Sequence, residues 1–144
     1  MIEPALDMSA LVKAVTSLED SLDVVSNDAW FNQQSAKVRN TLLAGVIQNF
    51  EFVYEISIKM VKRQIELESS SPTEVDETSF RDVLRIAAEK GMIADVDAWF
   101  RYRKMRNITA HTYDHEKAQQ VYKDTLVFIS DARSLLDRLK ARNG

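Results

Sequence analysis

The sequence predicts an all-α protein, and three observations carry that prediction. Only two prolines and three glycines occur among the 144 residues, so few positions interrupt a helix. Apolar residues recur at three- and four-residue steps along most of the chain, which is the spacing of one helix face. No segment carries the signals of a strand. We therefore expect an up-and-down antiparallel bundle of about five helices, with residues 1–144 forming a single domain.

The composition excludes several classes of protein. Hydrophobic residues make up 45% of the chain and charged residues 28%, which is typical of soluble globular proteins. Cysteine is absent, so disulfides, thiolate metal sites and cysteine nucleophiles are excluded. No signal peptide and no apolar stretch near the ~18 residues of a spanning helix occur, so we expect a cytoplasmic protein without membrane contact. The net charge of −3 argues against a general nucleic-acid coat.

The first half of the chain divides into two predicted helices. Asp7 or Ser9 can cap the first helix, and apolar residues then repeat in helical register. These residues are Leu11, Val15, Leu18 and Leu22. Asn27-Asp28 marks a connection, and the longest segment, from about Ser35 to Glu68, carries two adjacent apolar stripes that indicate burial against more than one neighbour. Gly45 predicts a close helix crossing, because glycine in a helix interior costs roughly 1 kcal/mol against alanine.

The second half begins with a polar and acidic stretch, Ser69 to Glu77, which we expect to be a mobile linker that tolerates shortening. Thr78 or Ser79 then caps a short helix, and Gly91 lies where a left-handed C-cap belongs. Two further helices are predicted beyond that glycine. Asp95 caps the first of them, and the second covers about residues 116–142.

The helix predicted after Asp95 carries a polar motif toward its end, where Asp114 is expected to cap the last helix. At about 100° per residue, one side of this helix is predicted to be mixed and the other apolar. The mixed side holds Trp99, Arg103, Arg106, Asn107 and Ala110. The apolar side holds Tyr102, Met105 and Ile108.

Four functional side chains make up the motif: Arg106, Asn107, His111 and Tyr113. If the helix continues to His111, that residue meets Asn107 on one face, and Arg106 lies about a quarter-turn away. A guanidinium beside an imidazole can hold a phosphate while protons move. In RNA cleavage without a metal, Arg106 would stabilise the transition-state charge and His111 would act as general base or acid. Because that reaction needs two proton-transfer groups and one chain offers a single well-placed histidine, we expect a two-fold homodimer.

The order Arg106, four residues, His111, one residue, Tyr113 resembles the Arg-x4-His-x-Tyr signature of HEPN domains. A second block, residues 48–55 with Lys59-Met60, resembles the long second helix of HEPN proteins that pair with minimal nucleotidyltransferases. The resemblance implies a HEPN-like helical bundle over residues 1–144 and a composite site at a homodimer interface. It also implies a separately encoded nucleotidyltransferase as partner, which in such systems is thought to modify the tyrosine and silence the HEPN subunit.

Several neighbours of the motif are open to two interpretations. Glu51 and Glu55, four apart on the long helix, could orient the arginine or the histidine, or Glu55 could pair with Lys59 on a solvated face, a contact worth only ~0.3 kcal/mol. Tyr113 could serve as an acceptor of a nucleotidyl group or only as a packing residue before a helix. Arg103 is a supporting cation or an ordinary surface charge.

No metal or cofactor is expected. His111 and His115 have the i, i+4 spacing of helical metal ligands, but a turn is expected between them and no other histidine or cysteine exists. Asp95-Val96-Asp97 matches the Asp-x-Asp of nucleotidyltransferases only as text, because it lies at a helix start, and no glycine is followed by serine. The chain itself therefore lacks a nucleotidyltransferase active site.

Two functional hypotheses follow. In the first, the chain is the HEPN subunit of a toxin-antitoxin type module, a metal-independent ribonuclease that acts through Arg106 and His111 and is neutralised by its partner nucleotidyltransferase. In the second, it is a non-catalytic subunit that binds substrate or nucleotide for a separately encoded nucleotidyltransferase, with Arg103, Arg106 and Tyr113 lining a ligand groove. A purely structural helical module is a third interpretation and leaves the motif without a role.

Overall fold

A computed structural model describes residues 6–71, 73, 75, 78–111 and 115–144, without the side chains of residues 110, 111, 115 and 116. These residues form six α-helices and no strand, which confirms the predicted all-α bundle. The helices are α1 (Ser9–Ser26), α2 (Asp28–Gln33), α3 (Ala36–Glu68), α5 (Phe80–Glu89), α6 (Val96–His111) and α7 (His115–Arg142). None of the helices in this part of the chain is both long and apolar enough to cross a membrane.

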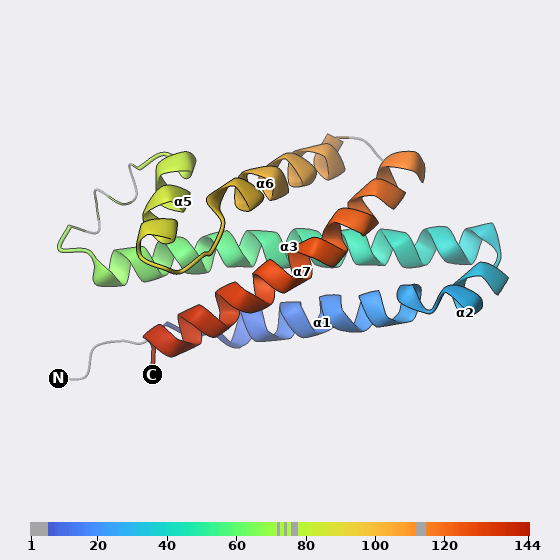
Figure 1. Cartoon of the computed structure of the whole chain (residues 1–144), viewed down its shortest axis with the longest axis horizontal. Coiled ribbons are helices and arrows are strands. Elements are labelled where there is room, and N and C mark those ends of the chain that lie inside the picture. The colour runs from blue at the N-terminus through green and yellow to red at the C-terminus, as the bar shows by residue number, and fades with distance from the viewer. Residues whose placement is uncertain (1–5, 72, 74, 76–77, 112–114) are drawn as a thin grey trace.

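Helix α3 is the axis of the molecule, because α1, α5, α6 and α7 all pack against it. Figure 1 shows α1 running alongside α3 with α2 at the turn between them, while α5 and α6 cover another side of α3. Helix α7 crosses the bundle and returns the chain to its starting end, where the Leu6 N–H donates to Asn143 Oδ1 at 3.0 Å. The motif helix α6 is therefore held between α5, α3 and the middle of α7.

An aromatic cluster in the core ties α6 to α3 and α7. Phe128 of α7 makes edge-on contacts with Phe50 of α3 at 4.9 Å, Tyr102 of α6 at 4.8 Å and Trp99 of α6 at 5.7 Å between ring centroids. Each of these four side chains is at most 3% exposed. Edge-on ring pairs add roughly 0.5–1.5 kcal/mol each beyond their buried area. The position of the motif helix is thus set by packing on its buried side.

Most of the predicted helix boundaries are confirmed by their capping contacts. The Ser35 and Ser79 hydroxyls accept from backbone N–H groups at the starts of α3 and α5, at 3.2 and 3.3 Å. Asp95 accepts from two N–H groups at the start of α6, and Gly91 has a positive φ of 78° after α5. Such caps satisfy backbone groups that a helix end leaves unpaired. The Asp114 cap lies outside the described residues.

Two local predictions are wrong, and one helix was missed. Helix α1 starts after Met8 without a side-chain cap, because the Asp7 carboxylate instead accepts from the N–H of Ser9, at 3.0 Å. The predicted connection is found at Asn27, but it leads directly into α2, a helix of six residues that is too short for periodicity to reveal. A Cβ added to Gly45 would meet no atom within 4 Å among the described residues, so no close crossing occurs there.

The segment expected to be a linker contributes to the core. Val75, its single large apolar residue, is 7% exposed and belongs to the buried cluster. Its carbonyl accepts from the Thr78 N–H at 3.1 Å, just ahead of α5. The segment is therefore anchored to the core at Val75, which the prediction of a mobile linker did not anticipate.

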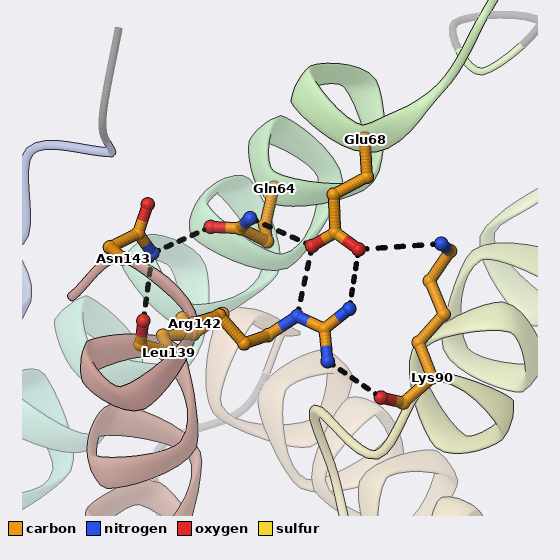
Figure 2. Close-up of polar contacts among 6 residues, drawn as sticks. All are labelled: Gln64, Glu68, Lys90, Leu139, Arg142 and Asn143. Atoms are coloured by element: carbon orange, nitrogen blue, oxygen red, sulfur yellow. Dashed lines mark hydrogen bonds and ion pairs between the residues drawn. The ribbon is translucent and has the colours of Figure 1, made fainter. Parts of the chain in front are cut away.

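A polar network, here called the C-terminal cluster, joins the ends of α3, α5 and α7; it consists of Gln64, Glu68, Lys90, Arg142 and Asn143. Figure 2 shows that the Arg142 guanidinium donates to the Glu68 carboxylate through two nitrogens, Nε at 2.9 Å and Nη2. Its third nitrogen, Nη1, donates to the Lys90 carbonyl at 2.8 Å. Gln64 donates to Glu68 at 2.8 Å and accepts from Asn143 at 2.7 Å. The hydrogen bond from Arg142 is the main reason that the pKa of Glu68 falls to about 2.

Candidate functional site

The buried side of α6 differs from the predicted one. Trp99, Tyr102 and Met105 are at most 7% exposed, whereas Ile108 is 44% exposed. The arc that packs against α3 and α7 is therefore centred on Tyr102, and about 100° per residue carries Ile108 out of it. Arg106 falls near the edge of this buried arc, so its side chain reaches α3 and stays partly exposed. Trp99 on the mixed side and Ile108 on the apolar side were wrong predictions.

Arg106 is held by two carboxylates of α3, and we call Arg106, Glu51 and Glu55 the arginine–carboxylate trio. Glu55 Oε1 accepts from Arg106 Nε at 3.0 Å and from Nη2 at 2.7 Å. Glu51 Oε2 lies 3.4 Å from Nη1. The hydrogen bond to Glu55 raises the pKa of Arg106 above its ordinary value, so the guanidinium stays charged. Of the two open interpretations, Glu55 pairs with the arginine and not with Lys59.

The trio carries surplus negative charge and keeps unused donors. Two carboxylates against one guanidinium leave a net charge of about −1 for three ionised groups. A guanidinium has five N–H donors, and the contacts to Glu55 use two of them. The Arg106 side chain is 25% exposed and that of Glu55 46%, so both can be reached from solvent. The trio can therefore fix the arginine and still offer donors to an anion.

The other predicted supporting residues spread away from the trio. The Arg103 guanidinium stacks on the Phe80 ring of α5, 4.1 Å from the ring centroid, a cation–π contact that ties α6 to α5. Asn107 is exposed, and its side chain has no hydrogen-bond partner in the described part of the chain. The structure brings Glu51 and Glu55 to Arg106, and it does not bring Arg103 or Asn107 into that group.

The backbone of the histidine segment is described in part. Helix α6 remains helical to His111 and α7 begins at His115, so the two histidines belong to different helices. His111 follows Arg106 by five positions, which places its Cα about 140° further round α6 and about 7.5 Å along it. The predicted meeting of Asn107 and His111 involves a side chain outside the described residues, and Tyr113 lies outside them altogether.

Two buried phenols interact with charged groups of other helices. Burial raises the pKa of Tyr54 to about 12, against the opposing effect of Arg103 and Arg106 nearby. Tyr102 donates a hydrogen bond to Asp131 of α7, and burial followed by that carboxylate raises the pKa of the phenol. Neither role has a signal in the sequence, because each depends on a partner from another helix.

No metal centre is evident in the described residues, where no three histidine, aspartate or glutamate side chains gather closely enough to hold an ion. The Asp95-Val96-Asp97 sequence starts α6, where the carboxylate of Asp95 caps the helix. It therefore has the structural role expected of acidic residues at a helix start.

Fold and site together define a class of protein: an all-α bundle that presents an arginine, fixed by two carboxylates, shortly before a histidine at a helix end. The chain matches the family described as nucleotidyltransferase substrate binding protein like over residues 6–141, and it belongs to this family. This membership confirms the resemblance to the HEPN subgroup that pairs with nucleotidyltransferases.

Two comparisons, one with a curated protein and one with a solved structure, show how closely the whole chain follows the family. A protein of Haemophilus influenzae named probable ribonuclease HepT is 43% identical over 143 residues, which cover 99% of this chain and 98% of that protein. A solved structure from Haemophilus influenzae, described as revealing the fold of a substrate binding domain of a nucleotidyltransferase, superposes with a TM-score of 0.90 at 42% identity. The superposition covers 93% of this chain and 99% of that one.

Proposed function

We propose that this chain is a metal-independent endoribonuclease, the HEPN subunit of a two-component module that a separately encoded minimal nucleotidyltransferase neutralises. The observation that carries the proposal is the arginine–carboxylate trio, which fixes a guanidinium in the helix that ends at His111. The relative named probable ribonuclease HepT, 43% identical over nearly the full length of both chains, supports the same activity. We place the protein in the cytoplasm, together with its RNA substrate and its partner.

In the proposed reaction the 2′-hydroxyl of the RNA attacks the adjacent phosphorus, and the bond from phosphorus to the 5′-oxygen of the next nucleotide breaks. His111 acts as general base or acid at one of these oxygens. Arg106 donates to the phosphoryl oxygens, which carry growing charge in the transition state. Glu51 and Glu55 are positioning residues, because they contact the arginine and not the substrate. Asn107 and Arg103 are assigned supporting contacts to the RNA.

The reaction needs one group to remove a proton and another to supply one, and we propose that a homodimer provides both. The Cα atoms of Arg106 and His111 lie about 140° apart around α6, so one straight helix directs the two positions to different sides. A two-fold pair of α6 helices would set the histidine position of one chain near the arginine of the other. If light scattering at micromolar concentration detects only monomer, the proposal of a composite site shared by two chains is wrong.

A second candidate function has its own support. The family description and the description of the solved relative both name substrate binding for a nucleotidyltransferase. In that role the exposed donors of Arg106 and Arg103, with Tyr113, would bind a nucleotide or substrate without cleaving it. We also propose Tyr113 as the acceptor through which the partner enzyme would modify and silence the ribonuclease.

One experiment separates the two candidates. Purified protein is incubated with single-stranded RNA in EDTA, and products with 2′,3′-cyclic phosphate ends are sought by gel and mass spectrometry. Cleavage that requires His111 supports the ribonuclease. RNA left intact by the wild-type protein, with a nucleotide or the partner enzyme still bound, would reject the ribonuclease in favour of the binding subunit.

A further inference from the structure

A hollow of about 360 Å³ lies at the α2 end of the bundle, and none of the three trio residues lines it. Its lining comes from the end of α1, from α2, from α3 and from the early turns of α7. A second hollow of about 250 Å³ adjoins it, because Phe31, Leu43 and Gln119 line both. Leu43 precedes Glu51 by eight residues, or about 12 Å of helix. The two hollows form one trough at a distance from Arg106.

Two aromatic side chains and an apolar floor give the trough the character of a ligand pocket. Phe31 of α2 and Tyr122 of α7 line it, both half-buried, and neither takes part in the aromatic contacts of the core. Val25 and Leu43 lie beneath them and are at most 5% exposed. Ligand pockets have volumes of roughly 300–1,000 Å³ and combine such apolar walls with a few polar groups.

The polar side chains around the trough are available to a ligand. Asn32, Gln119 and Lys123 line the first hollow and are exposed, and none of them has a hydrogen-bond or ion-pair partner among the described residues. Asp28 also lines it, and its carboxylate acts electrostatically on the Tyr122 phenol, so the phosphate groups are assigned to the side of Lys123 and Arg39. In the C-terminal cluster, by contrast, the polar side chains bind one another. Arg39 lines the second hollow, where its Nη1 donates to the Gln34 carbonyl at 2.9 Å and so keeps the guanidinium at that position.

We propose that this trough, defined by Phe31, Tyr122, Gln119, Lys123 and Arg39, binds a nucleotide. The base lies against the two rings, because every base has a flat face that stacks on aromatic side chains. The Gln119 amide, which can both donate and accept, meets the polar edge of the base. Lys123 and Arg39 supply cations for the phosphate groups.

The same chemistry would recognise a free mononucleotide or one nucleotide of an RNA strand. The trough does not contain Arg106, so the proposal does not depend on the ribonuclease activity. It assigns a binding site beside the early turns of α7 that holds its ligand without breaking any bond. Failure of RNA cleavage and failure of this site are therefore separate results.

The test uses the full-length protein and the fluorescence of Trp30. Trp30 precedes Phe31 in α2 and is 40% exposed, whereas Trp99 is 2% exposed in the core and gives a constant background. Adenosine monophosphate and a short oligoadenylate are titrated separately in EDTA, with isothermal titration calorimetry as a second measurement. We expect saturable quenching by at least one of them; tighter binding of the oligonucleotide assigns the site to an RNA strand, and equal binding assigns it to the free nucleotide.

Three variants connect the binding to the trough. Lys123→Glu and Gln119→Ala change exposed side chains and are expected to keep the fold, and Lys123→Glu should weaken binding roughly tenfold through loss of a charge-assisted contact. Lys13→Glu, an equal charge change on the exposed side of α1, is the control and should bind like the wild type. Absence of saturable quenching with both probes overturns the proposal, and so does equal binding by Lys123→Glu, Gln119→Ala and the wild type.

Discussion

The molecule contains two groups of arginine and glutamate side chains with opposite balance. In the C-terminal cluster one carboxylate, Glu68, lies between two cations, Arg142 and Lys90 at 3.4 Å. In the trio one cation, Arg106, lies between two carboxylates. The first group has surplus positive charge and the second surplus negative charge. Both connect helices that are far apart in the sequence.

The difference lies in how completely the polar atoms are used. In the C-terminal cluster Glu68 accepts from Arg142, Gln64 and Lys90, while Arg142 donates also to a backbone carbonyl. This network joins the ends of α3, α5 and α7 and leaves few unpaired polar atoms that a ligand could bind. In the trio, Glu55 is 46% exposed and Arg106 keeps unused donors. We infer that the first group serves stability and that the second serves the proposed chemistry.

The largest expected effect comes from the two groups proposed to act on the substrate. Arg106→Ala should slow RNA cleavage in EDTA roughly a hundredfold or more, because a lost contact to a transition-state phosphate costs on the order of 3 kcal/mol. His111→Ala should abolish cleavage and retain the helical circular dichroism spectrum. Arg85→Ala, which changes an exposed arginine of α5, is the matched control. If Arg106→Ala cleaves RNA as fast as the control Arg85→Ala, Arg106 does not belong to the catalytic site.

A smaller effect is expected from the positioning carboxylate. Glu55→Gln weakens the two contacts that orient the guanidinium, so cleavage should fall by roughly tenfold while the melting temperature changes little. Lys59→Gln, one turn further along α3, is the control because Lys59 does not pair with Glu55. If Glu55→Gln lowers stability and leaves cleavage unchanged, the trio is a structural fastener like the C-terminal cluster.

In the C-terminal cluster we expect a substitution to lower stability and to leave RNA cleavage unchanged. Arg142→Ala removes the contacts to Glu68 and to the Lys90 carbonyl, and should lower the free energy of unfolding by about 1–2 kcal/mol. Cleavage at a temperature where the variant is folded should equal that of the wild type. Arg63→Ala breaks only an exposed pair with Glu66 within α3 and should change stability by less than about 0.5 kcal/mol.

The same cluster predicts how stability depends on pH. The folded protein lowers the pKa of Glu68 from its ordinary 4.5 to about 2, chiefly through Arg142. Because the pKa of Glu68 is lower in the folded protein than in the unfolded chain, Glu68 contributes its full stabilisation above about pH 4.5. This stabilisation is lost as the pH falls toward 2. Urea denaturation of the wild type and of Glu68→Gln should show a difference in unfolding free energy that narrows between pH 5 and about 3. A difference that stays constant over this range would contradict the assignment.

The smallest expected effect is a gain at a site outside both groups. Gly45→Ala should raise the free energy of unfolding by roughly 0.5–1 kcal/mol, because the added methyl group meets no atom within 4 Å and alanine favours the helix. Thermal denaturation measures the change, and RNA cleavage should be unaffected. A loss of stability would contradict this prediction.

The helices and many of their ends could be predicted from the sequence because their causes are local. Ser35, Ser79 and Asp95 cap helices through backbone groups two or three residues away, and Gly91 ends α5 through its own φ. The order of Arg106 and His111 is likewise a property of the sequence, and the family match accords with the resemblance drawn from it. The six-residue helix α2 was missed because it is shorter than the pattern used to find helices.

Tertiary packing alone decided which partners these side chains meet. Arg106 and Glu55 are 51 residues apart, and the arginine reaches α3 because Tyr102 and Phe128 set the rotation of α6. The sequence allowed Glu55 to pair with Arg106 or Lys59, and proximity across two packed helices selected Arg106. Glu68 and Arg142 meet because α7 returns to the end of α3. Such choices depend on distances between helices, which no local pattern of residues contains.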